Sequence, residues 1–216
     1  MPGMSASPDI FEYIRLPKEQ YTTHLLSWIK PKAREPIEQY AQRMCQYIQQ
    51  KEVVLIGVSL GGVVVQEMAK LISTKRLILI STVKSKFELP RSMRMGQKTK
   101  LYRILPTSLV KHFKKINTLP IGRHLKKRLK LYERYVGPID KYYLDWAIEQ
   151  LLNWSQQDPP MQCIHIHGTR DHIFPIKNIK HCIRVNNGTH LMIINRYAWF
   201  NQHLPSLIEK GALQAS

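Results

Sequence analysis

The sequence predicts an α/β protein in which a mostly parallel central sheet is flanked by helices and interrupted by a helical insert. Two short apolar runs, Val53 to Ile56 and Leu77 to Ile80, have the length and composition of buried strands. A helical pattern lies between them, and strand, helix and strand within about thirty residues is typical of a crossover between parallel strands. A third apolar run, Cys163 to Ile166, follows a long stretch without a convincing strand. These observations favour a single sheet, with one long insert in the sequence between its second and third predicted strands.

The first elements can be placed in chain order. Apolar residues recur at helical spacing from Ile37 to Ile48, and Pro36 suits a first helical turn. After the strand at 53–56, a second helix is expected to run through Met68 and Leu71. The strand at 77–80 completes the crossover unit.

From Lys84 to Asn153 the pattern changes to helices and prolines. Apolar residues with helical spacing form three stripes: Leu109, Phe113 and Ile116; Ile121, Leu125, Leu129 and Tyr132; Leu144, Ile148 and Leu151. Strands return at 163–166 and, more weakly, at Cys182 to Val185, and a last helix contains Trp199, Leu204, Leu207 and Ile208. We therefore expect a core of residues 1–83 and 154–216 and a helical cap of residues 84–153.

Length and composition allow one domain with a substantial core. The chain has 216 residues, of which 44% are hydrophobic. No apolar run is long enough to cross a bilayer, and residues 1–7 show no signal peptide. The three cysteines, Cys45, Cys163 and Cys182, fit neither a disulfide framework nor a zinc site. We expect a cytoplasmic protein with reduced, structural thiols and no transmembrane segment; oligomeric state stays open.

Positive charge is concentrated in the predicted cap. The formal net charge is +18, and residues 84–130 hold fifteen Lys or Arg residues against one acid, Glu88. Such a segment either attracts an anionic substrate or acidic surface, or forms a solvated helical face whose long side chains lie over apolar surface. No nucleic-acid-binding module is recognisable, and few aromatic residues lie among the lysines, so we expect no nucleic-acid partner.

A G-x-S-x-G motif, Gly57 to Gly61, lies between a predicted buried strand and a predicted helix. A nucleophile elbow is a sharp turn between a strand and a helix, so this position suits one. Such a turn lifts the Ser59 hydroxyl above the sheet and directs backbone N–H groups toward the same space. Neighbours without side chains are needed on both sides of such a turn. A serine hydroxyl also needs a base that takes its proton.

Two later segments complete the pattern. Residues 167–175 (HGTRDHIFP) and 187–190 (NGTH) each follow a predicted strand. With the serine motif they resemble the α/β-hydrolase superfamily, in which the chain order is serine, acid, histidine. The resemblance implies that Asp171 is the acid and His190 the base of a triad with Ser59. It is closest to compact bacterial hydrolases that share "GxSLGG" (57–62), "LISTxKxxxELP" (79–90) and "HGxxDxIFP" (167–175), and it is weakest in the insert.

The resemblance reaches the start of the chain. Pro2 to Ala6 is similar to the glycine-containing oxyanion loop of the superfamily, which implies that the N–H groups of Met4 and Leu60 hold the oxyanion. In those relatives an apolar strand precedes this loop in the middle of the sheet. No such run precedes Gly3 here, so the first central strand is expected to be missing, either because the sequence starts downstream of the natural beginning or because the sheet has a gap.

Each candidate has an ordinary alternative. Ser59 suits a helix N-cap, and Asp171 suits a turn between glycine and proline signals. Asp158 is a competing acid, but it lies before a strand. His190 could be a surface residue, although its place after Gly188 and before a helix favours catalysis. A metal site from His165, His167, His172 and His181 lacks a carboxylate or thiolate that would complete a tetrahedral set, so we expect none.

The leading hypothesis is an esterase-like serine hydrolase that acts on a small acyl substrate, with an anionic one as a possibility, and that needs no cofactor. Serine as the nucleophile disfavours the branches of the superfamily that use aspartate. The competing hypothesis is a catalytically idle scaffold that binds an anionic partner through the basic cap. A third keeps the triad for non-hydrolytic chemistry, because one fold hosts many reactions.

Overall fold

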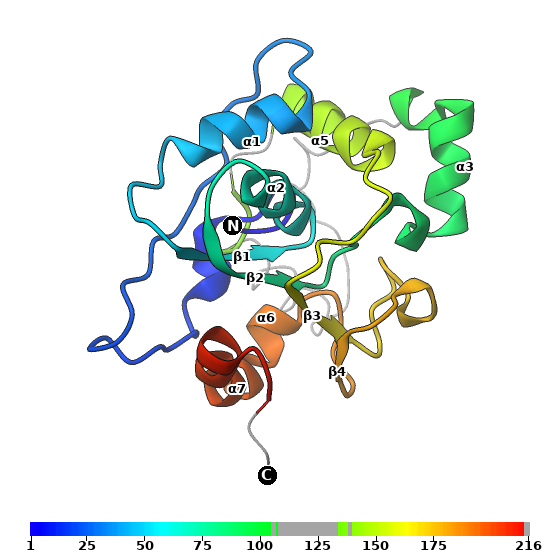
Figure 1. The fold of residues 1–216 in the computed structure, drawn as a ribbon. Coiled ribbons are helices and arrows are strands. Elements are labelled where there is room, and N and C mark those ends of the chain that lie inside the picture. Colours follow the sequence, from blue (N-terminus) through cyan, green and yellow to red (C-terminus); the bar gives the residue numbers. More distant parts are fainter. Residues whose placement is uncertain (105–106, 108–133, 138–139, 214–216) are drawn as a thin grey trace.

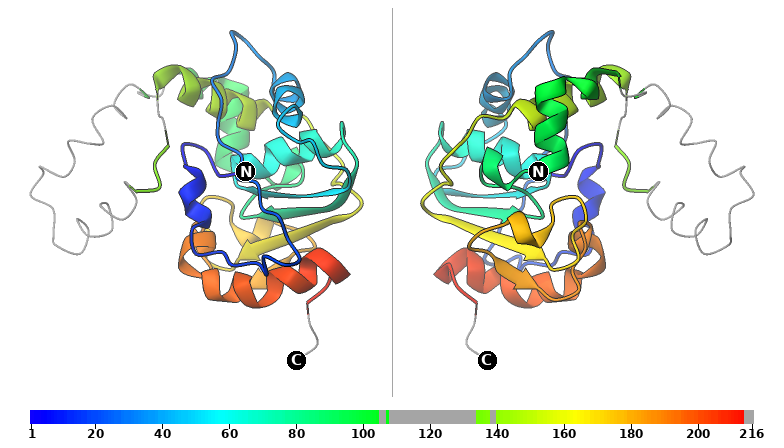
Figure 2. Two further views of the ribbon diagram at one scale, coloured as in Figure 1. Left: turned by 90° about the vertical axis from the view of Figure 1, so that its left-hand side faces the viewer. Right: turned by 90° about the vertical axis from the view of Figure 1, so that its right-hand side faces the viewer.

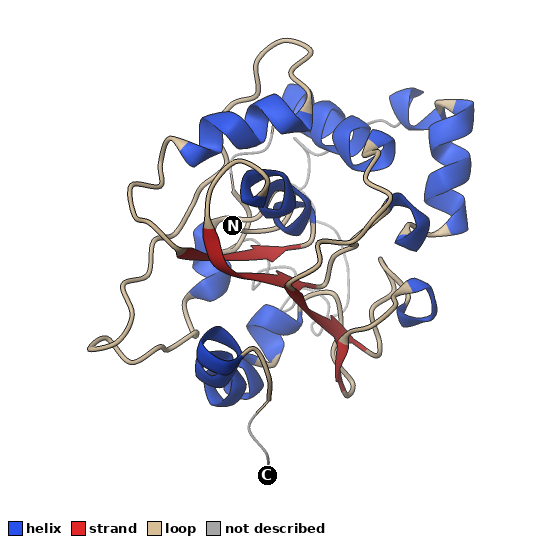
Figure 3. Ribbon diagram, in the orientation of Figure 1, coloured by secondary structure: helices blue, strands red, loops and turns tan. Residues whose placement is uncertain are grey.

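The structure of the protein is a computed structural model that describes residues 1–104, 107, 134–137 and 140–213. The apolar stripes expected at 109–116 and 121–132, and the cations between them, fall outside these residues. Four strands form one parallel sheet in the order β1-β2-β3-β4 (Figure 3). Their bounds are Val53–Val58, Thr74–Ile80, Cys163–Gly168 and Ile183–Val185. The predicted parallel sheet is confirmed.

Helices cover both faces of this sheet (Figure 1 and Figure 2). On one face lie α1 (Ile37–Cys45), α2 (Leu60–Ala69) and α5 (Lys141–Asn153). On the other lie α6 (Met192–Asn195) and α7 (Tyr197–Lys210). A hydrophobic core lies on each face of the sheet, and residues of β2 point alternately into the two cores. Leu77 and Leu79 pack with the first set of helices, and Ile78 and Ile80 pack with the second. Burial on both faces explains why the strands read as continuous apolar runs.

Several element ends differ from the prediction. The sequence pattern placed the end of the first helix at Ile48, but α1 ends at Cys45, and the N–H groups of Tyr47 and Ile48 bond carbonyls three residues back. In the same way α2 ends at Ala69 rather than Leu71. Such tight turns commonly close the last turn of a helix. β2 begins at Thr74, three residues before the apolar run, because its polar first residues pair with β1 through the backbone.

Among the described residues, β1 lies at one edge of the sheet. In the part of the chain that the structure describes, Met1 forms backbone hydrogen bonds with the outer edge of β1. Its amino group donates to the Ile56 carbonyl at 2.8 Å, and its carbonyl accepts from the Val58 N–H at 3.1 Å. These bonds set the N-terminal loop beside the end of β1.

Between β2 and β3 the described residues form helices. α3 (Arg91–Thr99) and the 3-10 helix η3 (Leu101–Ile104) lie against α5 (Figure 1). α5 in turn packs on α1, where the rings of Trp146 and Tyr40 lie 4.6 Å apart. The division into a core and a cap of residues 84–153 stays a prediction. No described helix is both long and apolar enough to cross a bilayer.

Candidate active site

The turn between β1 and α2 holds Ser59 in a conformation that side chains rarely adopt. Ser59 has φ 53° and ψ −124°. A Cβ on Gly57 would lie 2.5 Å from the Gly61 carbonyl oxygen, and a Cβ on Gly61 would lie 2.2 Å from the Pro2 carbonyl oxygen. Both positions therefore require glycine, which is the physical reason for the G-x-S-x-G pattern. Ser59 precedes α2, but its side chain makes no capping hydrogen bond.

The Ser59 hydroxyl faces His190 instead. The distance from His190 Nε2 to Ser59 Oγ is 3.0 Å, and the distance from His190 Nδ1 to Asp171 Oδ2 is 2.9 Å. The structure thus brings the three residues singled out in the sequence into one hydrogen-bonded chain. A carboxylate only accepts, so Nδ1 carries the proton and Nε2 is left to accept from the serine. Asp158 lies exposed before β3.

The Asp171 carboxylate is buried, with 3% of the residue exposed. Its Oδ1 atom accepts from the N–H groups of Ile173 and Phe174, each at 2.9 Å. Burial alone would raise the pKa of Asp171, but the hydrogen bond from His190 and those from the backbone outweigh it and lower the pKa below the usual value. The carboxylate therefore stays ionised while it orients the imidazole.

Two glycines let the acid and base loops meet. A Cβ on Gly168, at the end of β3, would lie 2.3 Å from the Gly188 carbonyl oxygen. The same carbonyl accepts from the Arg170 N–H at 2.8 Å, and Thr169 N donates to the Val185 carbonyl at 3.1 Å. The turn with Asp171 is thereby tied to the loop with His190 at one end of neighbouring parallel strands.

His167 lies behind Asp171 and is fully buried. Its Nε2 atom lies 2.8 Å from the Phe174 carbonyl oxygen and 3.4 Å from Asp171 Oδ2, and its Nδ1 atom lies 3.4 Å from His165 Nε2. Desolvation lowers the pKa of both histidines. In the sequence these two histidines were weighed only as metal ligands, and no local pattern pointed to this contact behind Asp171. Among the described residues no group of three His, Cys, Asp or Glu side chains is arranged to hold a metal.

The loop proposed to supply the oxyanion hole is held from two sides. Gly3 lies beside the nucleophile, since a Cβ there would lie 3.3 Å from Ser59 Cβ. The Gly3 carbonyl accepts from Trp28 Nε1 at 2.8 Å, and Ser5 N donates to the Tyr143 hydroxyl at 3.2 Å. The Met4 N–H between these anchors has no acceptor within the described part of the chain, nor has the Leu60 N–H. Neither N–H is therefore engaged by another described group, and Met4 also lines the cavity described below.

One cation of the basic segment (residues 84–130) is buried and forms specific contacts. Lys84 is buried, and its Nζ atom donates to the carbonyls of Lys180 and His181 at 2.6 and 3.1 Å. Glu88, also buried, lies 4.0 Å from Nζ and accepts from the N–H groups of Lys84 and Lys180. This pair ties the exit of β2 to the loop between β3 and β4. Lys86 is half-buried, and the remaining described cations of the segment are exposed: Arg91, Arg94, Lys98, Lys100 and Arg103.

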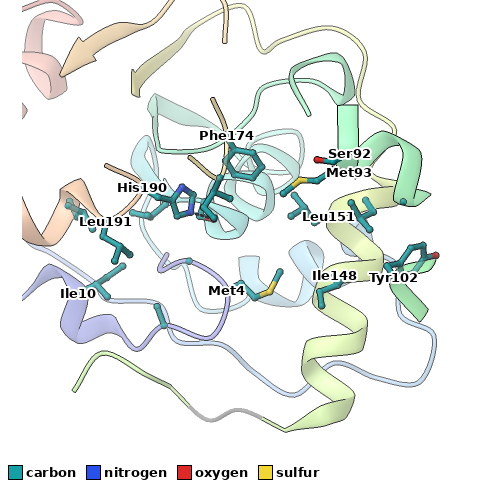
Figure 4. A pocket seen from close by; sticks show the side chains of 18 of the residues that line it. Met4, Ile10, Ser92, Met93, Tyr102, Ile148, Leu151, Phe174, His190 and Leu191 are labelled. Atoms are coloured by element: carbon teal, nitrogen blue, oxygen red, sulfur yellow. Dashed lines mark hydrogen bonds between the residues drawn. The ribbon is translucent and has the colours of Figure 1, made fainter. Parts of the chain in front are cut away.

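A cavity of about 590 Å³ opens over Ser59 and His190 (Figure 4). Its described lining is almost wholly apolar and contains no Lys, Arg, Asp or Glu. The polar side chains that reach it are those of Ser59, His190, Ser92 and Tyr102. A cavity of this size and character suits a small organic ligand. The three thiols, Cys45, Cys163 and Cys182, are free and lie outside its lining, and burial raises the pKa of each.

The parallel sheet, the strained serine turn and the order of the site loops define the α/β-hydrolase fold, and comparison with solved structures agrees. An esterase from Thermogutta terrifontis superposes with a TM-score of 0.62 at 12% identity over 97% of this chain and 88% of its own. A hydrolase from Pseudomonas aeruginosa gives 0.62 at 13% over 98% and 88%. An esterase from Exiguobacterium antarcticum gives 0.59 at 15% over 97% and 92%. No protein-family model matches the sequence, and neither does any curated protein.

Proposed function

We propose that this protein is a serine hydrolase of the esterase type that acts on a small acyl substrate. One observation carries the proposal: Asp171, His190 and Ser59 form a continuous hydrogen-bonded chain, with distances of 2.9 and 3.0 Å, at the floor of an apolar cavity. Further support comes from the fold, which the chain shares with structures described as esterases.

In the first half of the proposed reaction, Ser59 Oγ attacks the ester carbonyl while its proton passes to His190 Nε2. The carbonyl oxygen becomes an oxyanion and accepts from the N–H groups of Leu60 and Met4. Donors of this kind contribute about 10²- to 10³-fold each in related chemistry. The carbon–oxygen bond to the leaving group then breaks, and the departing alkoxide takes the proton from His190.

The second half releases the acid. A water molecule gives its proton to His190 Nε2 and attacks the acyl carbon, and the proton returns to Ser59 as the acyl bond breaks. Throughout, the ionised Asp171 stabilises the imidazolium and keeps Nδ1 protonated. No cofactor enters this sequence of steps.

The test is covalent labelling with a fluorophosphonate, located by mass spectrometry, together with hydrolysis of 4-nitrophenyl acetate. We expect one adduct, on Ser59, and loss of labelling and hydrolysis in Ser59→Ala. Ser92→Ala is the matched control, because Ser92 lines the same cavity without a base beside it. A folded protein that neither labels nor hydrolyses esters would refute the proposal and favour a binding scaffold, whereas labelling without ester hydrolysis would favour other triad chemistry.

A further inference from the structure

The lining of the cavity falls into two groups, which lie on either side of Met4 and Phe174 in Figure 4. In Figure 4, Ile10 and Leu191 lie on one side together with His190, and Ser92, Met93, Tyr102, Ile148 and Leu151 lie on the other. We call the first side the leaving-group arm; it is completed by Ile193 and Ile194. We call the second the acyl arm; it is formed by α3, η3 and α5 and is completed by Gly96, Leu101 and Leu152.

The chemistry assigns a role to each arm. His190 Nε2, 3.0 Å from Ser59 Oγ, must also reach the leaving oxygen in order to protonate it. The leaving group of the tetrahedral intermediate therefore lies on the side of His190. With the oxyanion directed at Met4 and Leu60, the remaining substituent, the acyl chain, points away from His190 and enters the acyl arm.

The acyl arm suits an uncharged hydrocarbon chain. Its described lining holds no charged side chain. The Tyr102 hydroxyl is already engaged, 3.4 Å from Glu149 Oε1 and 3.1 Å from Asn153 Nδ2. A carboxylate at the end of the acyl chain would thus leave water without a charged partner among the described lining residues, which is unfavourable. The exposed cations of α3 do not belong to the described lining of the cavity, so they give no reason to expect an anionic acyl group.

Gly96 leaves space in this arm. It lies in the interior of α3, where glycine is less favourable than alanine. Ser92 and Met93, at positions i−4 and i−3, also line the cavity, so a side chain at 96 would share their face. A Cβ built there meets no atom within 4 Å, and the backbone φ is not positive. A larger side chain at this position would shorten the acyl arm without strain.

We infer that the acyl arm between α3 and α5 binds an uncharged alkyl chain and that Gly96 sets the maximal length of that chain. The inference rests on the proposed attack of Ser59 on an ester, and goes beyond it by naming the acyl group and the residue that limits it. Each added methylene should raise kcat/KM by about fourfold until the arm is full.

The experiment measures kcat/KM for straight-chain 4-nitrophenyl esters from acetate to decanoate in the wild type, Gly96→Ala and Gly96→Phe. We expect a rise with chain length in the wild type and an earlier maximum in Gly96→Phe, with a loss of at least about tenfold for the longest good substrate and less than about twofold for acetate. Gly96→Ala should lie between them, and Gly96→Leu replaces the phenylalanine variant if that one fails to fold.

Two controls separate the inference from the proposed function. Ile194→Phe, in the leaving-group arm, should leave the acyl-length profile unchanged and alter the preference among alcohols of acetate esters. The 4-nitrophenyl monoester of adipic acid, which carries a terminal carboxylate, should react at least about tenfold more slowly than the hexanoate. Acetate hydrolysis with a flat length profile, an unaltered profile in Gly96→Phe, or preference for the adipate would overturn the inference and leave the hydrolase proposal standing. Absence of labelling and of all hydrolysis would overturn both.

Discussion

Replacement of His167 with leucine tests whether the acid of the proposed triad is supported from behind. Nε2 of this fully buried imidazole lies 2.8 Å from the Phe174 carbonyl oxygen. A carbonyl only accepts, so Nε2 carries the proton and donates it. Leucine is similar in size but donates nothing, and it leaves that carbonyl without its bond inside the protein.

The expected size of the effect follows from this bond and its neighbours. A buried polar group without a partner costs roughly 1–3 kcal/mol, so we expect His167→Leu to lower the free energy of unfolding by about 2 kcal/mol. Phe174 also donates its N–H to Asp171 Oδ1, so a shift of the Phe174 backbone displaces the carboxylate of the proposed triad. A displacement of about 1 Å can cost on the order of 10²-fold in rate. We expect kcat to fall by about 10- to 100-fold, with KM almost unchanged because His167 does not line the cavity.

The assay combines kcat and KM for 4-nitrophenyl butyrate with urea unfolding. His167→Gln offers an amide N–H in place of the imidazole and should recover part of kcat. His165→Leu is the matched control, because His165 contacts His167 only at 3.4 Å and its Nδ1 atom has no hydrogen-bond partner among the described residues. We expect it to change stability by less than about 1 kcal/mol and to leave kcat near wild type. Wild-type kcat in His167→Leu, or an equal loss in His165→Leu, would refute the reasoning.

Three further predictions concern pH, the buried ion pair and the oxyanion loop. Because burial lowers the pKa of His165 and His167, the unfolded chain binds protons that the folded chain excludes. The free energy of unfolding should therefore fall as the pH drops below about 6.5, by at most about 1.4 kcal/mol per pH unit for each histidine, and His165→Leu should flatten this slope in urea titrations. Lys84→Met removes the partner of buried Glu88 and should cost about 3 kcal/mol in urea unfolding, whereas Lys84→Met with Glu88→Leu should cost less; equal costs would contradict the pairing. Tyr143→Phe removes the hydroxyl that accepts from Ser5 N in the loop proposed to hold the oxyanion, and should lower kcat by about tenfold without raising KM; an unchanged kcat would mean that the loop needs no such anchor.

Much of the sheet could be predicted because each buried strand is marked by the apolar character of its own consecutive residues. Buried parallel strands read as apolar runs, and the runs at 53–56, 77–80 and 163–166 lie inside β1, β2 and β3. β4 was the weakest prediction, and it is also the shortest strand, with three residues. The strand ends were missed where pairing is made by backbone groups of polar residues, as at Thr74, because such pairing leaves no hydrophobic signal.

The site was predictable where sterics restrict the residue type. A Cβ on Gly57, Gly61 or Gly168 would clash with a backbone oxygen, and one on Gly188 would lie 3.0 Å from Gly168 Cα. The glycines of the motifs are therefore required by the close approach of neighbouring segments. The supports of the site were not predictable. Trp28 reaches Gly3 across 25 positions and Tyr143 reaches Ser5 across 138, and no local pattern marks side chains that meet only after folding.

The charge of the chain was the hardest feature to interpret from sequence, and α3 shows why. One face of this helix presents Ser92, Met93 and Gly96 to the cavity, while Arg91, Arg94 and Lys98, at spacings of three and four, are exposed. A count of lysines and arginines cannot tell these two faces apart, whereas the period of the helix separates them. Charge and apolar binding therefore occupy opposite sides of one helix. It follows that an anionic surface or partner would meet the outer face of α3, and that neutralising its cations should alter such an association without changing which acyl chains the cavity accepts.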